Sequence, residues 1–275
     1  MEWGYLFWCI DKFGFGPKLI CWVKLLYNSP TSSVRTNNTN SQSFPLQRGT
    51  RQGCPISPLL FAIAIEPLAM AIRSSPEIRG IVRGGKEHKT SLYADDLLLY
   101  ITDPQNTLPH IMKLLDLFSS ISGHKINVLK SELFPVNSAA KSISFNSCPF
   151  KVTSDNFTYL GVVVKRGFSD LFKLNFVPLL ESSKIAFNKW SMLPFSLAGR
   201  INLIKMNTLP KFLYLFQTIP IFINKSSFSH LNKIISDFIW NKKPPRIHRE
   251  FLQRPRSMAG LTLPHFQLYY WASNL

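Results

Sequence analysis

Acidic residues are scarce in this chain: 15 Asp and Glu stand against 32 Lys and Arg, which gives a formal net charge of +17 over 275 residues. A positive field of this size attracts a polyanion, either nucleic acid or an anionic membrane surface, and charge alone does not choose between them. Charged residues make up only 17% and hydrophobic residues 45%, a composition that excludes intrinsic disorder. The length predicts one large domain or two closely packed ones.

Cysteine is also infrequent. The four cysteines, Cys9, Cys21, Cys54 and Cys148, are far apart and include no Cys-x-x-Cys pair, which argues against a zinc ribbon and against a dense disulfide scaffold. A reducing, intracellular location is therefore expected. The basic residues form no clear localisation cluster, so nucleus and cytoplasm both stay open.

Long uninterrupted apolar runs are missing as well. Residues 209–223 come closest, but Lys211, Gln217 and Pro220 break this stretch before it reaches the roughly 18 apolar residues of a membrane helix. The start of the chain carries Glu2 where a secretory signal peptide has Lys or Arg. Neither a signal peptide nor a membrane partner is expected.

Apolar periodicity and turn residues predict both helices and strands. Helices are expected over residues 5–13, 18–27, 59–73 and 108–118, and strands over residues 78–83, 89–100, 125–129 and 157–164. From residue 168 onward, helical periodicity dominates. This order predicts an α+β fold class, with a boundary near Lys165 that separates a mixed domain from a helical one.

Two adjacent acids, Asp95 and Asp96, interrupt the apolar stretch SLYADDLLLY at residues 91–100. Aspartate is common in turns, so a purely structural hairpin turn is one interpretation. The other is a metal site, because Mg²⁺ prefers carboxylate oxygens and substrate phosphates, and a tight hairpin holds such ligands rigidly. The stretch by itself leaves both interpretations open.

Three further segments accompany the acidic pair: RGTRQGCPISPLLF at residues 48–61, SGHKINVLKSE at residues 122–132 and FTYLGV at residues 157–162. Together the four segments resemble, in order, the later palm motifs of reverse transcriptases of the non-LTR (long interspersed element) retrotransposon branch. LAGRINLIKMNTLPKFLYLFQTIPI, FIWNKKPPRI and GLTLPHFQLYYWA are similar to the region that follows the polymerase core in those elements. The resemblance implies an incomplete polymerase palm, an antiparallel sheet with helices, over residues 1–165. It implies a mainly helical thumb and post-polymerase region over residues 166–275.

The resemblance also implies roles for individual residues. Asp95 would be a ligand of the catalytic Mg²⁺ ions with Asp96 beside it, and Lys130 would act as a general acid towards the pyrophosphate leaving group. Arg51, Gln52 and Gly53 match the segment that binds nucleotide or template beside the nascent base pair. Tyr159, Leu160 and Gly161 match the primer grip. Taken singly, most of these residues also have ordinary structural interpretations, as a solvated cation, a loop cap or a strand end.

The chain departs from the family at one catalytic position. Two-metal phosphoryl transfer holds its ions about 3.5 to 4 Å apart, and family members supply a further aspartate from a separate strand. The motif that carries this aspartate, and the fingers of the polymerase, would lie upstream of Met1. Glu2, Asp11 and Glu66 are unsuitable substitutes for the aspartate, because none of them ends an apolar strand. We therefore expect a fragment that is inactive alone. The missing strand would leave an exposed sheet edge beside Asp95, which favours aggregation or pairing with another chain.

Two functions from different classes are predicted. The first is an RNA-directed DNA polymerase that uses Mg²⁺ to transfer nucleotides from deoxynucleoside triphosphates to a DNA primer on an RNA template. The second is a non-catalytic nucleic-acid-binding remnant that keeps the basic surface. A cationic tract is either part of such a surface or merely solvated; it consists of Lys242, Lys243, Arg246, Arg249, Arg254 and Arg256. A membrane-surface protein is disfavoured, because the chain shows no long basic amphipathic helix.

Overall fold

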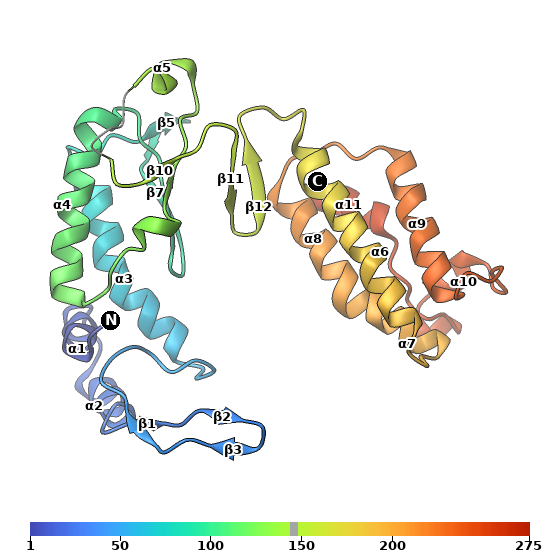
Figure 1. Cartoon of the computed structure of the whole chain (residues 1–275), viewed down its shortest axis with the longest axis horizontal. Coiled ribbons are helices and arrows are strands. Elements are labelled where there is room, and N and C mark those ends of the chain that lie inside the picture. Colours follow the sequence, from blue (N-terminus) through green and yellow to red (C-terminus); the bar gives the residue numbers. More distant parts are fainter. Residues whose placement is uncertain (144–147) are drawn as a thin grey trace. The chain divides into compact units, whose positions relative to one another are not determined.

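The computed structural model describes residues 1–143 and 148–275, and Figure 1 shows their helices and strands coloured along the chain. Internal packing divides them into two compact units. Unit 1 consists of Met1–Ser131 and a short segment that ends at Lys151, and unit 2 contains the other described residues up to Leu275. The functional boundary expected near Lys165 stays a prediction, because packing alone assigns no function.

Helices make up much of unit 1. They are α1 (Trp3–Lys12), α2 (Pro17–Leu26), α3 (Ser57–Ser74) and α4 (Pro104–Ser122). The ends of α4 show why they form where they do: Asp103 accepts a hydrogen bond from the Asn106 backbone N–H, and Gly123 ends the helix with a φ of +66°. The helices predicted for this part of the chain are confirmed, with ends shifted by a few residues.

The core of unit 1 lies between α1, α3 and α4. Its buried side chains recur about one helical turn apart: Leu6 and Ile10 on α1, Leu60, Ala64, Leu68 and Ile72 on α3, and Ile111 and Leu115 on α4. By length and composition α3 is apolar enough to cross a membrane, which residues 209–223 are not. Because α3 places its buried face in this core, core packing accounts for its apolar composition.

The strands of unit 1 form antiparallel hairpins. The pairs are β1 (Thr31–Ser32) with β4 (Phe44–Pro45), β2 (Arg35–Thr36) with β3 (Thr39–Asn40), β5 (Ile81–Arg83) with β6 (Lys86–His88), and β7 (Thr90–Tyr93) with β8 (Asp96–Leu99). In the described part of the chain every sheet has two strands. The predicted strand region at residues 89–100 is therefore confirmed as one hairpin, β7–β8.

The strand predicted over residues 125–129 is wrong. The chain there is irregular and ends in a 3-10 turn at Val128–Lys130, before the short strands β9 (Glu132–Leu133) and β10 (Lys151–Val152). The Asn127 side chain accepts a hydrogen bond from the Lys130 backbone N–H at 3.2 Å, and local capping of this kind competes with strand pairing. Leu129 is 93% exposed, so no core holds an extended conformation here.

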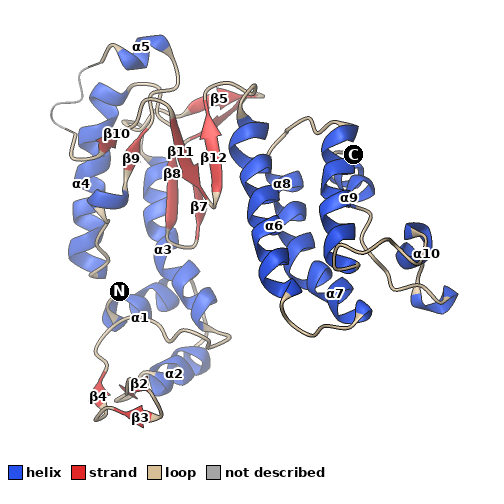
Figure 2. Ribbon diagram, turned by 45° about the vertical axis from the view of Figure 1, so that its right-hand side comes forward, coloured by secondary structure: helices blue, strands red, loops and turns tan. Residues whose placement is uncertain are grey.

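Unit 2 is mainly helical, as Figure 2 shows. Its elements are α5 (Ser138–Lys141), the hairpin β11 (Asn156–Tyr159) and β12 (Val162–Lys165), α6 (Val177–Ser191), α7 (Leu197–Leu203), α8 (Leu209–Thr218), α9 (Lys225–Ile239), α10 (Arg249–Gln253) and α11 (Phe266–Ser273). Fully buried phenylalanines dominate its core: Phe176, Phe212, Phe228 and Phe266. The strands predicted at residues 157–164, the helical second half and the α+β class are confirmed.

Candidate active site

The acidic pair lies at the tip of the β7–β8 hairpin. Tyr93 pairs with Asp96 across the ladder, so Ala94 and Asp95 form a two-residue loop. Ala94 has a φ of +50°, in the left-handed region that tight hairpin loops use. Both carboxylates are exposed. The turn therefore presents two acidic side chains at adjacent positions of a tight loop.

Leucines anchor this hairpin to unit 1. Because side chains alternate along a strand, Leu97 and Leu99 point to one face and Asp96 to the other. Leu92 stands opposite Leu97, and these three leucines pack against the core. Asp96 thus lies on the face away from the core. Among the described residues no third strand pairs with β7 or β8. An exposed edge beside Asp95 and aggregation through it stay predictions.

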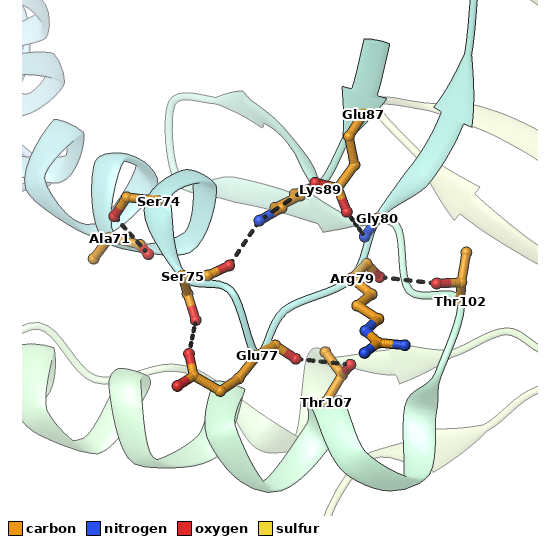
Figure 3. A network of polar contacts seen from close by, with 10 residues as sticks. All are labelled: Ala71, Ser74, Ser75, Glu77, Arg79, Gly80, Glu87, Lys89, Thr102 and Thr107. Atoms are coloured by element: carbon orange, nitrogen blue, oxygen red, sulfur yellow. Dashed lines mark hydrogen bonds and ion pairs between the residues drawn. The ribbon is translucent and has the colours of Figure 1, made fainter. Parts of the chain in front are cut away.

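Polar contacts tie the base of the hairpin to α3 and α4 (Figure 3). Lys89 precedes β7 and donates from Nζ to the Ser75 carbonyl oxygen at 2.7 Å, just after the end of α3. Thr107 of α4 donates from its hydroxyl to the Glu77 carbonyl oxygen at 3.3 Å. The first contact joins the start of β7 to the residue that follows α3, and the second joins Glu77 to α4, so the hairpin starts from a fixed base.

Gly80 is required by close packing at the same base. A Cβ at this position would lie 2.2 Å from the His88 carbonyl oxygen, so any side chain would force the backbone apart. The Gly80 N–H donates to the Glu87 carboxylate at 2.7 Å (Figure 3). This bond, with a smaller contribution from Lys89, lowers the pKa of Glu87. This hydrogen bond therefore favours the ionised form of Glu87, which lies on β6.

Arg51, Gln52 and Gly53 form a tight turn that precedes α3. The Cys54 N–H donates to the Arg51 carbonyl oxygen at 3.4 Å, and Gly53 at the third position has a φ of +81°. This combination is that of a type II turn, which favours glycine at the third position. All three residues are exposed, so the turn presents the side chains of Arg51 and Gln52 to solvent.

Cys54, directly behind this turn, has an unusual environment that the sequence analysis missed. The backbone N–H of Ile56 is the main cause of a lowered pKa of the Cys54 thiol, and Ser57 and the Arg51 guanidinium lower it further. Helix N-termini favour thiolates in this way, because their free N–H groups point at the sulfur. The only sequence signal is a cysteine shortly before the helix that was predicted from residue 59 and that begins at Ser57 in the structure.

His124 was also missed as a neighbour of the acidic pair. Its half-buried ring lies 6.1 Å from the Phe61 ring and 6.3 Å from the Phe118 ring, measured between centroids. Burial lowers the pKa of His124, the N-terminal ammonium group of Met1 lowers it further, and the Asp95 carboxylate acts in the opposite direction. The start of segment 122–132 therefore lies within electrostatic reach of Asp95.

Lys130 lies at the end of the Val128–Lys130 turn and is exposed. Among the described residues its ammonium group forms no ion pair, and no contact joins it to Asp95 or Asp96. The general-acid role of Lys130 therefore stays a prediction.

Tyr159, Leu160 and Gly161 lie in unit 2, at the turn of the β11–β12 hairpin. Leu160 and Gly161 have φ angles of +49° and +77°, and positive φ at both central residues is typical of a type I′ hairpin turn. Tyr159 pairs with Val162 across the ladder. The Tyr214 hydroxyl of α8 donates to the Leu160 carbonyl oxygen at 2.5 Å. The turn is therefore fixed to a helix of its own unit.

Asn175 provides the second attachment of this hairpin. Its side chain is buried, accepts from the Val163 N–H at 2.8 Å, and donates to the carbonyl oxygens of Val163 and Leu171 at 2.9 and 3.0 Å. Buried polar groups are costly unless they are paired, and here both ends of the amide are used. Strand β12 is thus locked to the π-helical turn Phe172–Phe176 that precedes α6.

Tyr214→Phe is expected to loosen the Leu160–Gly161 turn. The substitution keeps the ring and removes one hydrogen bond, which typically lowers the free energy of unfolding by about 0.5 to 1.5 kcal/mol. Urea unfolding followed in unit 2 measures this loss. Tyr269→Phe is the matched control, because both tyrosines are 42% exposed and the Tyr269 hydroxyl donates no hydrogen bond within the described residues. Equal effects of the two substitutions would contradict a role for the Leu160 contact.

The carboxylate oxygens of the hairpin tip are ligands of the type that hard divalent cations prefer. Mg²⁺ is commonly held by one or two carboxylates together with substrate phosphates and water. Asp95 and Asp96 supply two exposed carboxylates on adjacent residues. No group of three or more His, Cys, Asp or Glu side chains that could hold a metal is present in the described ranges. The pair therefore fits Mg²⁺, and a complete ligand set requires additional groups.

Comparisons with known proteins identify the family of the chain. The family model for "Reverse transcriptase (RNA-dependent DNA polymerase)" matches residues 1–164. The chain is 26% identical to the transposon TX1 uncharacterized 149 kDa protein of Xenopus laevis over 246 residues, which are 86% of this chain and 18% of the relative. It is 26% identical over 164 residues to a Pol polyprotein from the type-2 retrotransposable element R2DM of Drosophila melanogaster, covering 56% of this chain and 15% of the relative.

A third relative is a Pol polyprotein from the type-1 retrotransposable element R2 of Popillia japonica, which is 30% identical over 102 residues, 37% of this chain and 14% of the relative. The chain thus spans less than a fifth of the length of each of these three relatives. The family match covers more than half of the chain and contains the acidic hairpin, the Arg51–Gly53 turn and the Leu160–Gly161 turn. The chain belongs to the reverse transcriptase family, in its non-LTR retrotransposon branch.

Proposed function

We propose that this chain forms part of the palm and thumb of an RNA-directed DNA polymerase. In that role it would help to transfer nucleotides from deoxynucleoside triphosphates to a DNA primer on an RNA template. The observation that carries the proposal is the exposed acidic tip of the β7–β8 hairpin, which core leucines hold in place within the family-matched residues. Two exposed carboxylates that form no ion pair among the described residues can supply part of the metal ligands that phosphoryl transfer needs.

Around this tip, each predicted residue has a chemical task. Asp95 and Asp96 would hold Mg²⁺, which when bound supplies positive charge that stabilises the reacting phosphates. Gly53, with no side chain and a positive φ, would let the backbone approach the nascent base pair closely. The exposed Gln52 amide would hydrogen-bond to template or nucleotide, and the exposed Arg51 guanidinium would pair with a phosphate.

Two further groups would act on the leaving group and on the primer. The Lys130 ammonium would donate a proton to the departing pyrophosphate, which is general acid catalysis. The Leu160–Gly161 turn would support the primer strand, and its attachments to Tyr214 and Asn175 within unit 2 favour a rigid support. A rigid primer support matters because small displacements of reacting groups reduce rate strongly.

We further propose that the chain alone does not catalyse synthesis and that its basic surface suffices for nucleic-acid binding. The specific observation is the absence, within the described residues, of a third metal-ligating side chain beside Asp95 and Asp96. A non-catalytic binding remnant is accordingly the second candidate function. Residues 12–65 support binding, because they carry Lys12, Lys18, Lys24, Arg35, Arg48 and Arg51 and contain neither Asp nor Glu.

Primer extension separates the two candidates. The purified chain is incubated with a primed RNA template, Mg²⁺ and deoxynucleotides, beside an Asp95→Ala/Asp96→Ala variant. Extension that disappears in the variant would establish a working polymerase and would contradict inactivity of the chain alone. Absence of extension by protein that is folded and bound to template supports the non-catalytic candidate.

Binding to the same template is expected to weaken steeply with salt. Each phosphate contact contributes a slope of about 0.7 to 0.9 in log affinity against log salt, so six contacts would cost about a thousandfold between 50 and 200 mM. Lys242→Gln/Lys243→Gln tests the cationic tract, in which both lysines are exposed whereas Arg249 is partly buried against Asn232. A slope reduced by about one to two would place the tract on the nucleic acid; an unchanged slope would make it a solvated surface.

A further inference from the structure

Residues 1–3, at the N-terminal end of α1, contact two segments of the candidate active site. On one side, the Trp3 indole N–H donates to the Gly49 carbonyl oxygen at 2.8 Å, and the Gly49 N–H donates to the Met1 carbonyl oxygen at 2.8 Å. On the other side, the Glu2 N–H donates to the Ser122 carbonyl oxygen at 2.8 Å. Residues far apart in sequence are thus joined within unit 1 by three hydrogen bonds.

Gly49 is well suited to this double contact. Its φ of +89° lies in the region that glycine adopts without strain, and this conformation lets both its N–H and its carbonyl oxygen face α1. The half-buried Trp3 ring is itself supported by the Tyr27 ring, with centroids 5.3 Å apart. The indole N–H therefore comes from a side chain whose orientation packing already restricts.

The segment between Gly49 and α3 is short. Its far end is fixed at the start of α3, where the Ser57 N–H donates to the Cys54 carbonyl oxygen at 3.2 Å, and the Arg51–Gly53 turn is closed by the Cys54 N–H. Few residues separate the two attachments, so a displacement of Gly49 is transmitted directly to Arg51 and Gln52. The exposed side chains of the turn have no core contacts to resist such a displacement.

We propose that Trp3 is a positioning residue, whose indole N–H fixes the Arg48–Gly53 segment through the Gly49 carbonyl oxygen. Trp3 acts through Gly49 and touches neither Asp95 nor Asp96 in the described contacts. The inference deepens the proposed function. It rests on that function for the identity of what the segment binds, a nucleotide or a template. The geometric part, the indole hydrogen bond to the Gly49 carbonyl oxygen, stands on the protein alone.

Trp3→Phe in the full chain tests the proposal by amide hydrogen exchange. The phenyl ring keeps packing on Tyr27 while the donor is lost, so the Gly49 and Cys54 amides are expected to exchange roughly three- to tenfold faster. The Glu2 amide, which donates to Ser122, is expected to stay unchanged. In the wild-type chain the Trp3 indole proton should itself exchange slowly, because it is hydrogen-bonded to the Gly49 carbonyl oxygen. Its resonance is assigned by its absence from the spectrum of Trp3→Phe.

Trp8→Phe is the matched control. Trp8 lies on the same helix, is 51% exposed and stacks on Tyr5, and its indole N–H donates no hydrogen bond within the described residues. Equal exchange of Gly49 and Cys54 in wild type and in Trp3→Phe would overturn the proposal. So would a uniform increase that includes Glu2, because it would mean that the whole turn of α1 had loosened.

A kinetic measurement adds the functional consequence. Where primer extension is measurable, Trp3→Phe is expected to raise KM for the deoxynucleotide about fivefold or more while kcat changes less, because a misplaced turn weakens nucleotide binding. A purely structural role would lower the amount of active protein and leave KM unchanged. If neither extension nor template binding is observed, both candidate functions fail, whereas the exchange result still decides the role of Trp3.

Discussion

Asp95→Asn is expected to lower primer extension by at least about a thousandfold, in a polymerase that contains this chain together with a further carboxylate ligand. The amide is nearly the same size as the carboxylate, so the two-residue loop and the leucine anchors of the hairpin should persist. What changes is charge: a neutral oxygen binds Mg²⁺ weakly, and metal binding contributes several kcal/mol to stabilising the transition state. The measurement is the single-turnover rate of incorporation of one deoxynucleotide.

Asp103→Asn provides the control for this substitution. Asp103 lies eight positions further along, is partly exposed, and caps α4 by accepting from Asn106. Asparagine caps helices about as well as aspartate, so this variant should keep extension within about twofold of wild type. Near-wild-type extension by Asp95→Asn would remove Asp95 from the mechanism. A similar loss in both variants would show that removal of any nearby negative charge, rather than loss of a metal ligand, is responsible.

The acidic hairpin could be predicted because its signal is local. Two acids inside an apolar run indicate a turn, and Leu97 and Leu99 alternate with outward-facing residues as a strand requires. The Leu160–Gly161 turn is equally local, since Gly161 tolerates positive φ. The family resemblance then assigned chemistry to residues that pattern alone left ambiguous.

Other features could not be predicted, because they depend on contacts between distant residues. The Asp95 carboxylate influences the pKa of His124 only in the folded chain, in which the His124 ring lies near Phe61 and Phe118. The Trp3 contact with Gly49 joins residues 46 positions apart. The strand predicted at residues 125–129 was wrong because of a local contact. The side chain of Asn127 caps a turn there, and the β-type residues around it have no partner strand. Pattern alone cannot weigh a cap against pairing that depends on the rest of the fold.

Phe212→Ala is expected to lower the free energy of unfolding of unit 2 by about 3 to 5 kcal/mol. Phe212 is fully buried, and its ring centroid lies 5.6 Å from that of Phe176 and 5.4 Å from that of Phe266. Truncation removes these contacts and leaves a cavity that the surrounding aromatic rings cannot fill by a simple rotamer change. Phe222→Ala is the control, because Phe222 is 83% exposed and its loss should change stability by less than about 0.5 kcal/mol.

The readout must be local, because a chain with two separate cores need not unfold in one step. Amide exchange of Val163 is suitable, since its N–H donates to the buried Asn175 side chain and its strand packs through Val162 against the same core as Phe212. If the hairpin depends on the helical core, Phe212→Ala will accelerate exchange at Val163 while core amides of α3 in unit 1 stay protected. Unchanged exchange at Val163 would show that the hairpin is held by its own turn and by Tyr214. In that case the Leu160–Gly161 turn would be a locally stable support, and its rigidity would not require an intact aromatic core.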